Sequence, residues 1–125
     1  MGLMSKLVEG RRTKATAFVR DQLGTDEQPD AVLPMTQTRN PLAAGAQFYG
    51  IVALPTQVVM VGYPKLVETP NAIVASWDRD SVAIESWKRG VLMIRHPQGT
   101  TRLEVPRIHR KDAEALVAAL GGTVS

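Results

Sequence analysis

Cysteine is absent from this chain of 125 residues, and histidine occurs only twice. Without a thiol there is no disulfide framework, no thiolate nucleophile and no cysteine-ligated zinc. The two histidines, His96 and His109, lie far apart in the sequence, so we expect no metal site and no cofactor. The lack of cysteine fits a reducing compartment, and we expect a cytoplasmic protein.

Long apolar runs and enzyme motifs are also missing. No run reaches the length needed to cross a membrane, and the first residues lack the apolar core and small-residue cleavage site of a signal peptide. No phosphate-binding loop, dinucleotide-binding glycine pattern or Ser–His–Asp set is present. Because no nucleophile, base and orienting group can be assembled, we expect neither an enzyme nor a small-molecule substrate.

The formal net charge of +3 is placed unevenly. Residues 1–23 contain five basic and two acidic groups, a balance of +3, whereas residues 24–125 contain ten of each. A neutral remainder argues against a strongly basic nucleic-acid-binding domain. Nucleic acid is therefore not the partner we expect.

Residues 3–23 have the pattern of a basic amphipathic helix. Apolar side chains recur at helical spacing, and Gly24 is a fitting stop. Arg11 falls where the apolar stripe should continue, and we expect the basic side chains to form the solvated side. We expect the helix to dock on its own domain or a sister subunit, with an anionic membrane surface or a partner groove as the alternative. The candidate binding residues here are Lys6, Arg11, Arg12 and Lys14.

A polar, acidic linker at 25–30 separates the N-terminal segment, residues 1–24, from a domain at 31–125. In that domain, short apolar or alternating segments bounded by turn residues predict about seven strands. Pro34 assigns the first strand to an edge or a bulged position. We place the strands at 32–38, 48–54, 57–62, 72–77, 81–87, 91–96 and 101–105.

The stretch from 81 to 122 is the most clearly patterned. Between 82 and 87 the residues alternate, which places Val82, Ile84 and Ser86 on one face of the strand and Trp87 on the other. A helical stripe then predicts one C-terminal helix that packs on the preceding sheet and stops at two glycines. Its apolar positions are Ala113, Leu116, Val117 and Leu120. The order predicts a mainly β (α+β) fold, a small barrel capped by this helix.

Two segments of the chain resemble the bacterial pleckstrin-homology-like domains. Residues 73–82, with Trp77 and a charged turn before a valine-led strand, are similar to a strand-and-turn segment of that family. Residues 103–107 with 112–117 resemble its last strand running into its capping helix. The resemblance covers roughly residues 31–121. It implies a seven-stranded, strongly bent sheet with one open end covered by a helix, and binding or scaffolding rather than chemistry.

Two further basic clusters are candidate binding sites. The first is Trp87-Lys88-Arg89 at a hairpin tip, where an aromatic ring beside two cations suits an acidic partner or phosphate headgroups. The second comprises Arg107, His109, Arg110 and Lys111 around the start of the C-terminal helix, where backbone N–H groups are free. The simpler interpretations are a rim tryptophan before an ordinary polar turn and a solvated start of a helix.

These patterns favour a non-enzymatic pleckstrin-homology-like binding or scaffold module. It would act through contacts with a protein partner or with itself, with the basic helix as a tether and peripheral contact with an anionic membrane as one form. The alternative is a self-assembling structural protein whose N-terminal helix is exchanged between subunits. Nucleic-acid binding through the basic clusters is a weaker alternative.

Overall fold

The computed structural model describes residues 3–38, 46–65 and 69–122. Two α-helices, α1 (Leu3–Leu23) and α2 (Arg110–Ala119), lie at the two ends of this part of the chain. The strands between them are β1 (Ala31–Thr36), β2 (Phe48–Ala53), β3 (Gln57–Tyr63), β4 (Ala72–Asp78), β5 (Ala83–Lys88), β6 (Val91–His96) and β7 (Gly99–Glu104). Two 3₁₀ helices, η1 (Arg79–Ser81) and η2 (Arg107–His109), precede β5 and α2.

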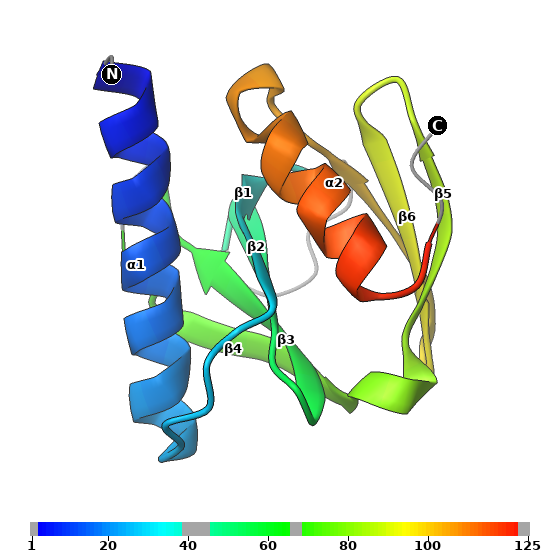
Figure 1. Ribbon diagram of the computed structural model, residues 1–125, viewed down its shortest axis with the longest axis horizontal. Helices are drawn as coiled ribbons and strands as arrows, with labels where there is room; N and C mark the ends of the chain where they lie inside the picture. The colour runs from blue at the N-terminus through cyan, green and yellow to red at the C-terminus, as the bar shows by residue number, and fades with distance from the viewer. Residues whose placement is uncertain (1–2, 39–45, 66–68, 123–125) are drawn as a thin grey trace.

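The strands form two antiparallel sheets, one in the order β1-β2-β3-β4 and one in the order β5-β6-β7. Figure 1 shows α1 along the outer side of the four-stranded sheet and α2 between the two sheets. The fold is therefore mainly β with a helix at each end, as the sequence predicts. Pro34 lies where the register of β1 against β2 shifts, between Leu33 and Thr36, and β1 is an edge strand, as expected.

The expected closure into one bent, barrel-like sheet is wrong for the described residues. The two sheets meet at a single bridge, where Gln37 and Glu104 exchange backbone hydrogen bonds of 2.9 and 2.7 Å. At the other junction η1 separates β4 from β5, so the hydrogen-bonded ladder stops there. The result is two packed sheets joined at one corner.

Two apolar clusters lie on opposite faces of the four-stranded sheet. In β3, Val58 and Met60 belong to the cluster between the sheets, whereas Val59 and Val61 belong to the cluster under α1. Successive side chains of a strand point to opposite faces, so a sheet covered on both sides requires a continuous apolar run. This explains why residues 58–61 show no alternation in the sequence.

Helix α1 packs on the four-stranded sheet of its own chain. The sequence favours either this position or the same position on a sister subunit. Ala15 and Val19 are fully buried against the four-stranded sheet, with Phe18 and Leu23 packed beside them. The expectation that the basic residues form a solvated side is wrong for Arg11, which is 8% exposed. Arg11 interrupts the apolar stripe because it reaches a buried hydrogen-bond partner, His109, across the interface.

Helix α2 buries the stripe that the sequence predicts. Leu116 and Val117 are fully buried in the cluster between the sheets, and Leu120 packs against it. The chain turns away at Gly121, which has a φ of 79°, a value that glycine adopts without strain. The helix therefore covers the apolar gap between the two sheets, as expected.

Candidate functional site

The β5–β6 hairpin places Trp87 differently from the expected alternation. Ile84 pairs with Ile94 but Ser86 pairs with Met93, so the extra residue in β5 forms a bulge at Glu85. A bulge shifts every later side chain to the other face. Ile84 and Trp87 consequently both pack on the cluster between the sheets, and the predicted opposition of these two residues is wrong. Trp87 is an anchor for the hairpin, partly exposed at its rim.

A tight turn at the end of this hairpin presents two cations. Lys88 pairs with Val91, and the two residues between them, Arg89 and Gly90, have φ values of 52° and 77°. Two positive φ values in a two-residue loop are the mark of a type I′ turn. Lys88 and Arg89 are both exposed there.

The start of α2 lies directly against this turn. A Cβ added at Gly90 would lie 2.6 Å from Nη2 of Arg110, so the arginine side chain rests on the glycine. The backbone N–H of Val105, just before η2, donates to the carbonyl oxygen of Gly90 at 2.8 Å. The structure therefore brings together the two basic clusters at 88–89 and 107–111, which the sequence shows as separate.

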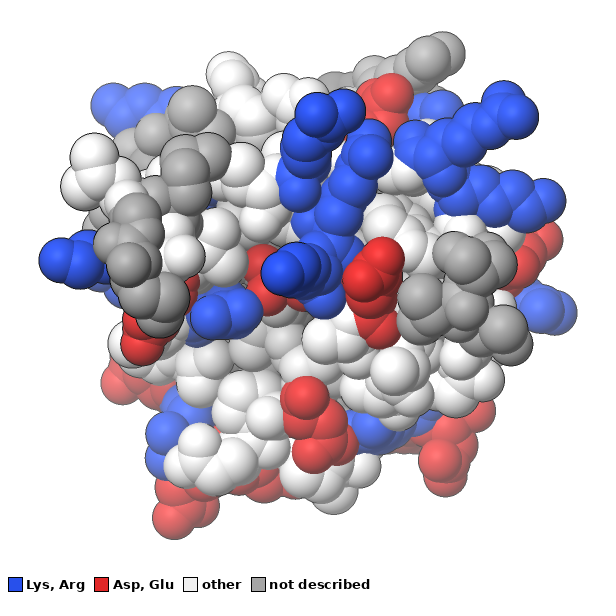
Figure 2. Space-filling model, turned by 45° about the horizontal axis from the view of Figure 1, so that its top comes forward, with Lys and Arg blue, Asp and Glu red and all other residues white. Residues whose placement is uncertain are grey.

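We call the five cations at this end the basic face: Lys88, Arg89, Arg107, Arg110 and Lys111. The placement of His109 in the second cluster as a surface residue is wrong, because its side chain is fully buried. All five are exposed, and within the described ranges none of them has a hydrogen-bond or ion-pair partner. In Figure 2, with the top of the molecule turned forward, Lys and Arg side chains gather on this part of the surface. Unpaired and exposed cations are available to an anionic partner.

The basic residues of α1 divide into two groups. Arg11 is bound to His109, and Arg12 donates to Oδ1 of Asp112 at 2.6 Å, so both are engaged in holding α1 to α2. Lys6 and Lys14 are exposed on the helix. Arg11 is therefore buried in the fold, whereas Arg12 stays exposed and is paired with Asp112.

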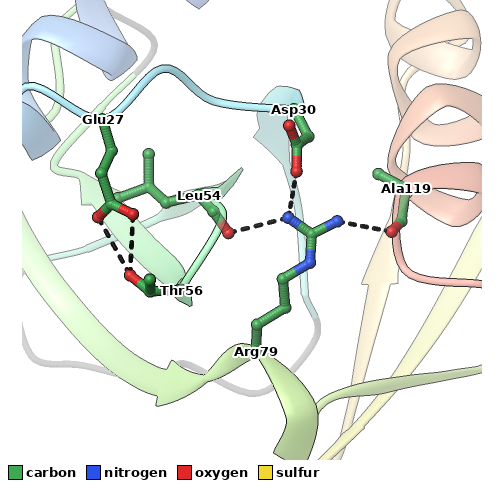
Figure 3. Close-up of polar contacts among 6 residues, drawn as sticks. All are labelled: Glu27, Asp30, Leu54, Thr56, Arg79 and Ala119. Atoms are coloured by element: carbon green, nitrogen blue, oxygen red, sulfur yellow. Dashed lines mark hydrogen bonds and ion pairs between the residues drawn. The ribbon is translucent and has the colours of Figure 1, made fainter.

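The opposite end of α2 is held by an arginine of η1 that the sequence analysis did not single out. Nη2 of Arg79 donates to the carbonyl oxygen of Ala119 at 2.7 Å, and Nη1 donates to that of Leu54 at 2.9 Å and to the carboxylate of Asp30 (Figure 3). Arg79 thus ties the linker, the β2–β3 connection and the end of α2 to one side chain. The flanking Asp78 and Asp80 are exposed turn residues.

A groove of about 400 Å³ lies beside β4 and is also unexpected from the sequence. Trp77 stacks on His96 with a centroid distance of 4.3 Å, and its indole N–H donates to Gln98. Burial lowers the pKa of His96, and the hydrogen bond with Gln98 opposes that shift. No short sequence signal could have found this pair, since residues 77 and 96 meet only across the gap between the sheets.

Two absences in the described part of the chain concern metal binding and membrane crossing. No group of three or more His, Asp or Glu side chains in the described part of the chain could hold a metal ion. Over the same ranges, no helix has both the length and the hydropathy that crossing a membrane requires.

Comparison of the chain with known proteins identifies no relative. No protein-family model, no curated protein and no solved structure matches the chain. Its own geometry, above all the basic face at the start of α2, is the ground on which a function can be inferred.

Proposed function

We propose that this protein is a non-enzymatic, pleckstrin-homology-like binding module of the cytoplasm, and that its basic face binds an acidic surface of a protein partner. The order of elements supports the first part. Seven strands followed by one helix that packs between the sheets is the order along the chain that the resemblance implies, although the strands form two sheets rather than one bent sheet.

The basic face supports the second part, and one observation carries it: Arg110 lies on Gly90. This contact joins the hairpin tip to the start of α2 and gathers cations 88–89 and 107–111 on one surface. Each exposed ion pair contributes little by itself, but five cations on one surface, unpaired among the described residues, together favour a carboxylate-rich partner.

The backbone conformation of Arg89 also supports a role of this residue in binding. It occupies a φ of 52°, a region in which a residue with a Cβ is strained by about 1–2 kcal/mol. Asparagine or glycine is the usual choice at this turn position. An arginine held there against local preference is explained if its charge is used in binding.

A protein partner fits this face better than a membrane does. Peripheral helices and loops bind membranes by inserting apolar side chains as well as by charge. Among the described residues the exposed large hydrophobic side chain is Leu3 on α1, and Trp87 is packed against the core. The basic face therefore offers charge without an apolar anchor.

The test is a titration of a fluorescently labelled peptide rich in Asp and Glu, followed by anisotropy at low and moderate salt. We expect binding that weakens as salt rises. The double variant Arg107→Gln/Arg110→Gln should bind about tenfold more weakly, which corresponds to about 1.4 kcal/mol.

The matched control is Arg95→Gln/Arg102→Gln, which removes the same charge from the three-stranded sheet. Both residues alternate along their strands with core residues and so lie on the outer face of that sheet. This control should change the affinity little. No binding at low salt, or equal losses in the two variants, would contradict the proposal. Tighter binding to phosphatidylserine vesicles or to duplex DNA than to the peptide would replace the protein partner by that ligand.

The alternative in which α1 is exchanged between subunits is decided by solution mass. In the structure α1 covers its own four-stranded sheet. Light scattering on the full chain should give a monomer, and a stable dimer that is lost on deletion of residues 1–24 would favour exchange instead.

A further inference from the structure

His109 is fully buried at the junction of α1, η2 and α2, with no part of it exposed. Its Nε2 lies 2.7 Å from Nη1 of Arg11, a residue 98 positions away in the chain. Its Nδ1 lies 3.2 Å from Oδ2 of Asp112. The imidazole therefore stands between α1 on one side and the first turn of α2 on the other.

The chemistry of these neighbours fixes the protonation state of the ring. A guanidinium can only donate hydrogen bonds, so Nε2 must present its lone pair to Arg11. An ionised carboxylate can only accept, so Nδ1 must carry the proton that faces Asp112. The docked position of α1 therefore requires a neutral His109, in one tautomer.

Charged groups of both signs from α1 and α2 surround the ring. Arg12 is already paired with Asp112 at 2.6 Å, so the carboxylate is shared between Arg12 and the imidazole. Glu9 of α1 and Lys111 of α2 line the same hollow as Arg12 and Asp112. From β3, Tyr63 adds no charge, because burial raises its pKa and outweighs the opposing effect of Arg11.

Two further elements, β1 and η2, lie near the ring. Strand β1, which also packs on η2, contains no titratable side chain. Arg107 of η2 is exposed and adds positive charge nearby. A proton on Nε2 would thus place two donors face to face in a buried site, Nε2–H and the Arg11 guanidinium.

We propose that His109 is a proton-operated latch, which holds α1 on the four-stranded sheet when it is neutral and releases α1 when it is protonated. A proton on Nε2 would oppose the contact with Arg11 that the docked position requires, so α1 should be held less firmly as the pH falls. Release uncovers the apolar face that α1 covers, formed by Val32, Met35, Val52, Leu54, Val59, Val61 and Tyr63. The latch goes beyond the proposed binding function and does not depend on it.

Hydrogen–deuterium exchange of the full chain at about pH 7.5 and about pH 5.5 tests the latch, with rates corrected for the intrinsic effect of pH. We expect the protection of α1 amides to fall on the order of tenfold at the lower pH, while β2 and β3 keep theirs. Equal protection of α1 at the two pH values would overturn the proposal.

Two variants assign the effect. His109→Gln keeps an acceptor for Arg11 but stays neutral, so the pH response of α1 should disappear. His96→Gln removes the only other histidine and should leave the response intact. A response that survives in His109→Gln, or disappears in His96→Gln, would contradict the latch. If His109→Gln does not fold, Arg11→Gln replaces it as the test variant. In Arg11→Gln the amides of α1 should be weakly protected at both pH values. A tenfold change in their protection between the two pH values would contradict the latch.

Discussion

At its C-terminal end, α2 is held by an arginine with three partners, whereas its N-terminal end carries arginines with none among the described residues. Arg79 is part-buried and bonded to Asp30, Leu54 and Ala119. Arg107 and Arg110 are exposed, and neither is paired with any residue that the structure describes. The same side chain thus contributes to stability at one end of the helix and leaves its donors available to a partner at the other.

This difference distinguishes a structural cation from the cations that we propose for binding. Each of the two regions is a short charged stretch beside a turn, 78–80 and 107–111, and neither composition nor spacing separates them. What separates them is whether distant carbonyl and carboxylate groups converge on the guanidinium. The predictions below test that distinction, from the largest expected effect to the smallest.

Removing the guanidinium of Arg79 should produce the largest loss of stability. Arg79→Met leaves the carbonyl oxygens of Leu54 and Ala119 without their donor and should lower the free energy of unfolding by about 3 kcal/mol. Arg107→Met, the matched change at the other end, should alter it by no more than about 0.5 kcal/mol. Urea denaturation of the two variants measures both, and equal effects would remove the contrast.

A side chain at Gly90 should test the contact that builds the basic face. Gly90→Ala must adopt a φ of 77°, so we expect a loss of about 1–2 kcal/mol, most of it from the backbone. The added Cβ also displaces the end of the flexible Arg110 side chain, so an Arg110→Ala background should recover a smaller part of the loss, up to about 0.5 kcal/mol. A double-mutant cycle from urea denaturation gives this coupling, and strict additivity would show that Arg110 does not rest on Gly90.

Arg89→Asn should weaken binding without lowering the stability of the fold, and its effects should be the smallest of the three. Asparagine suits the left-handed turn position, so the free energy of unfolding should stay the same or rise by about 0.5 kcal/mol. The affinity for the acidic peptide should fall about threefold, because one cation is lost from the face. Anisotropy and urea denaturation of one variant provide both numbers, and an unchanged affinity would exclude Arg89 from the site.

Much of the fold could be predicted because it is encoded by local periodicity. The buried stripe of α2 follows from a spacing of 3.6 residues, and the strands that contain residues 58–61 and 91–96 follow from short apolar runs between turn residues. The bulge at Glu85 could not be predicted, since one inserted residue reverses the face of Trp87 without any change in composition.

The sites were less predictable because they are built from residues far apart in the chain. The basic clusters were visible, but their union depends on the contact between Gly90 and Arg110. Arg11 could be noticed only as a break in an apolar stripe, and its partner His109 is 98 positions away. The separation of the strands into two sheets depends on η1, which the sequence shows only as a charged turn.

The most direct test of the basic face is a titration of isotopically labelled protein with the acidic peptide, followed by backbone amide chemical shifts. We predict that the shifts concentrate at residues 88–91 and 107–112 and leave those around Arg79 unchanged. Shifts centred on residues 78–81, or spread evenly over both ends of α2, would contradict the account.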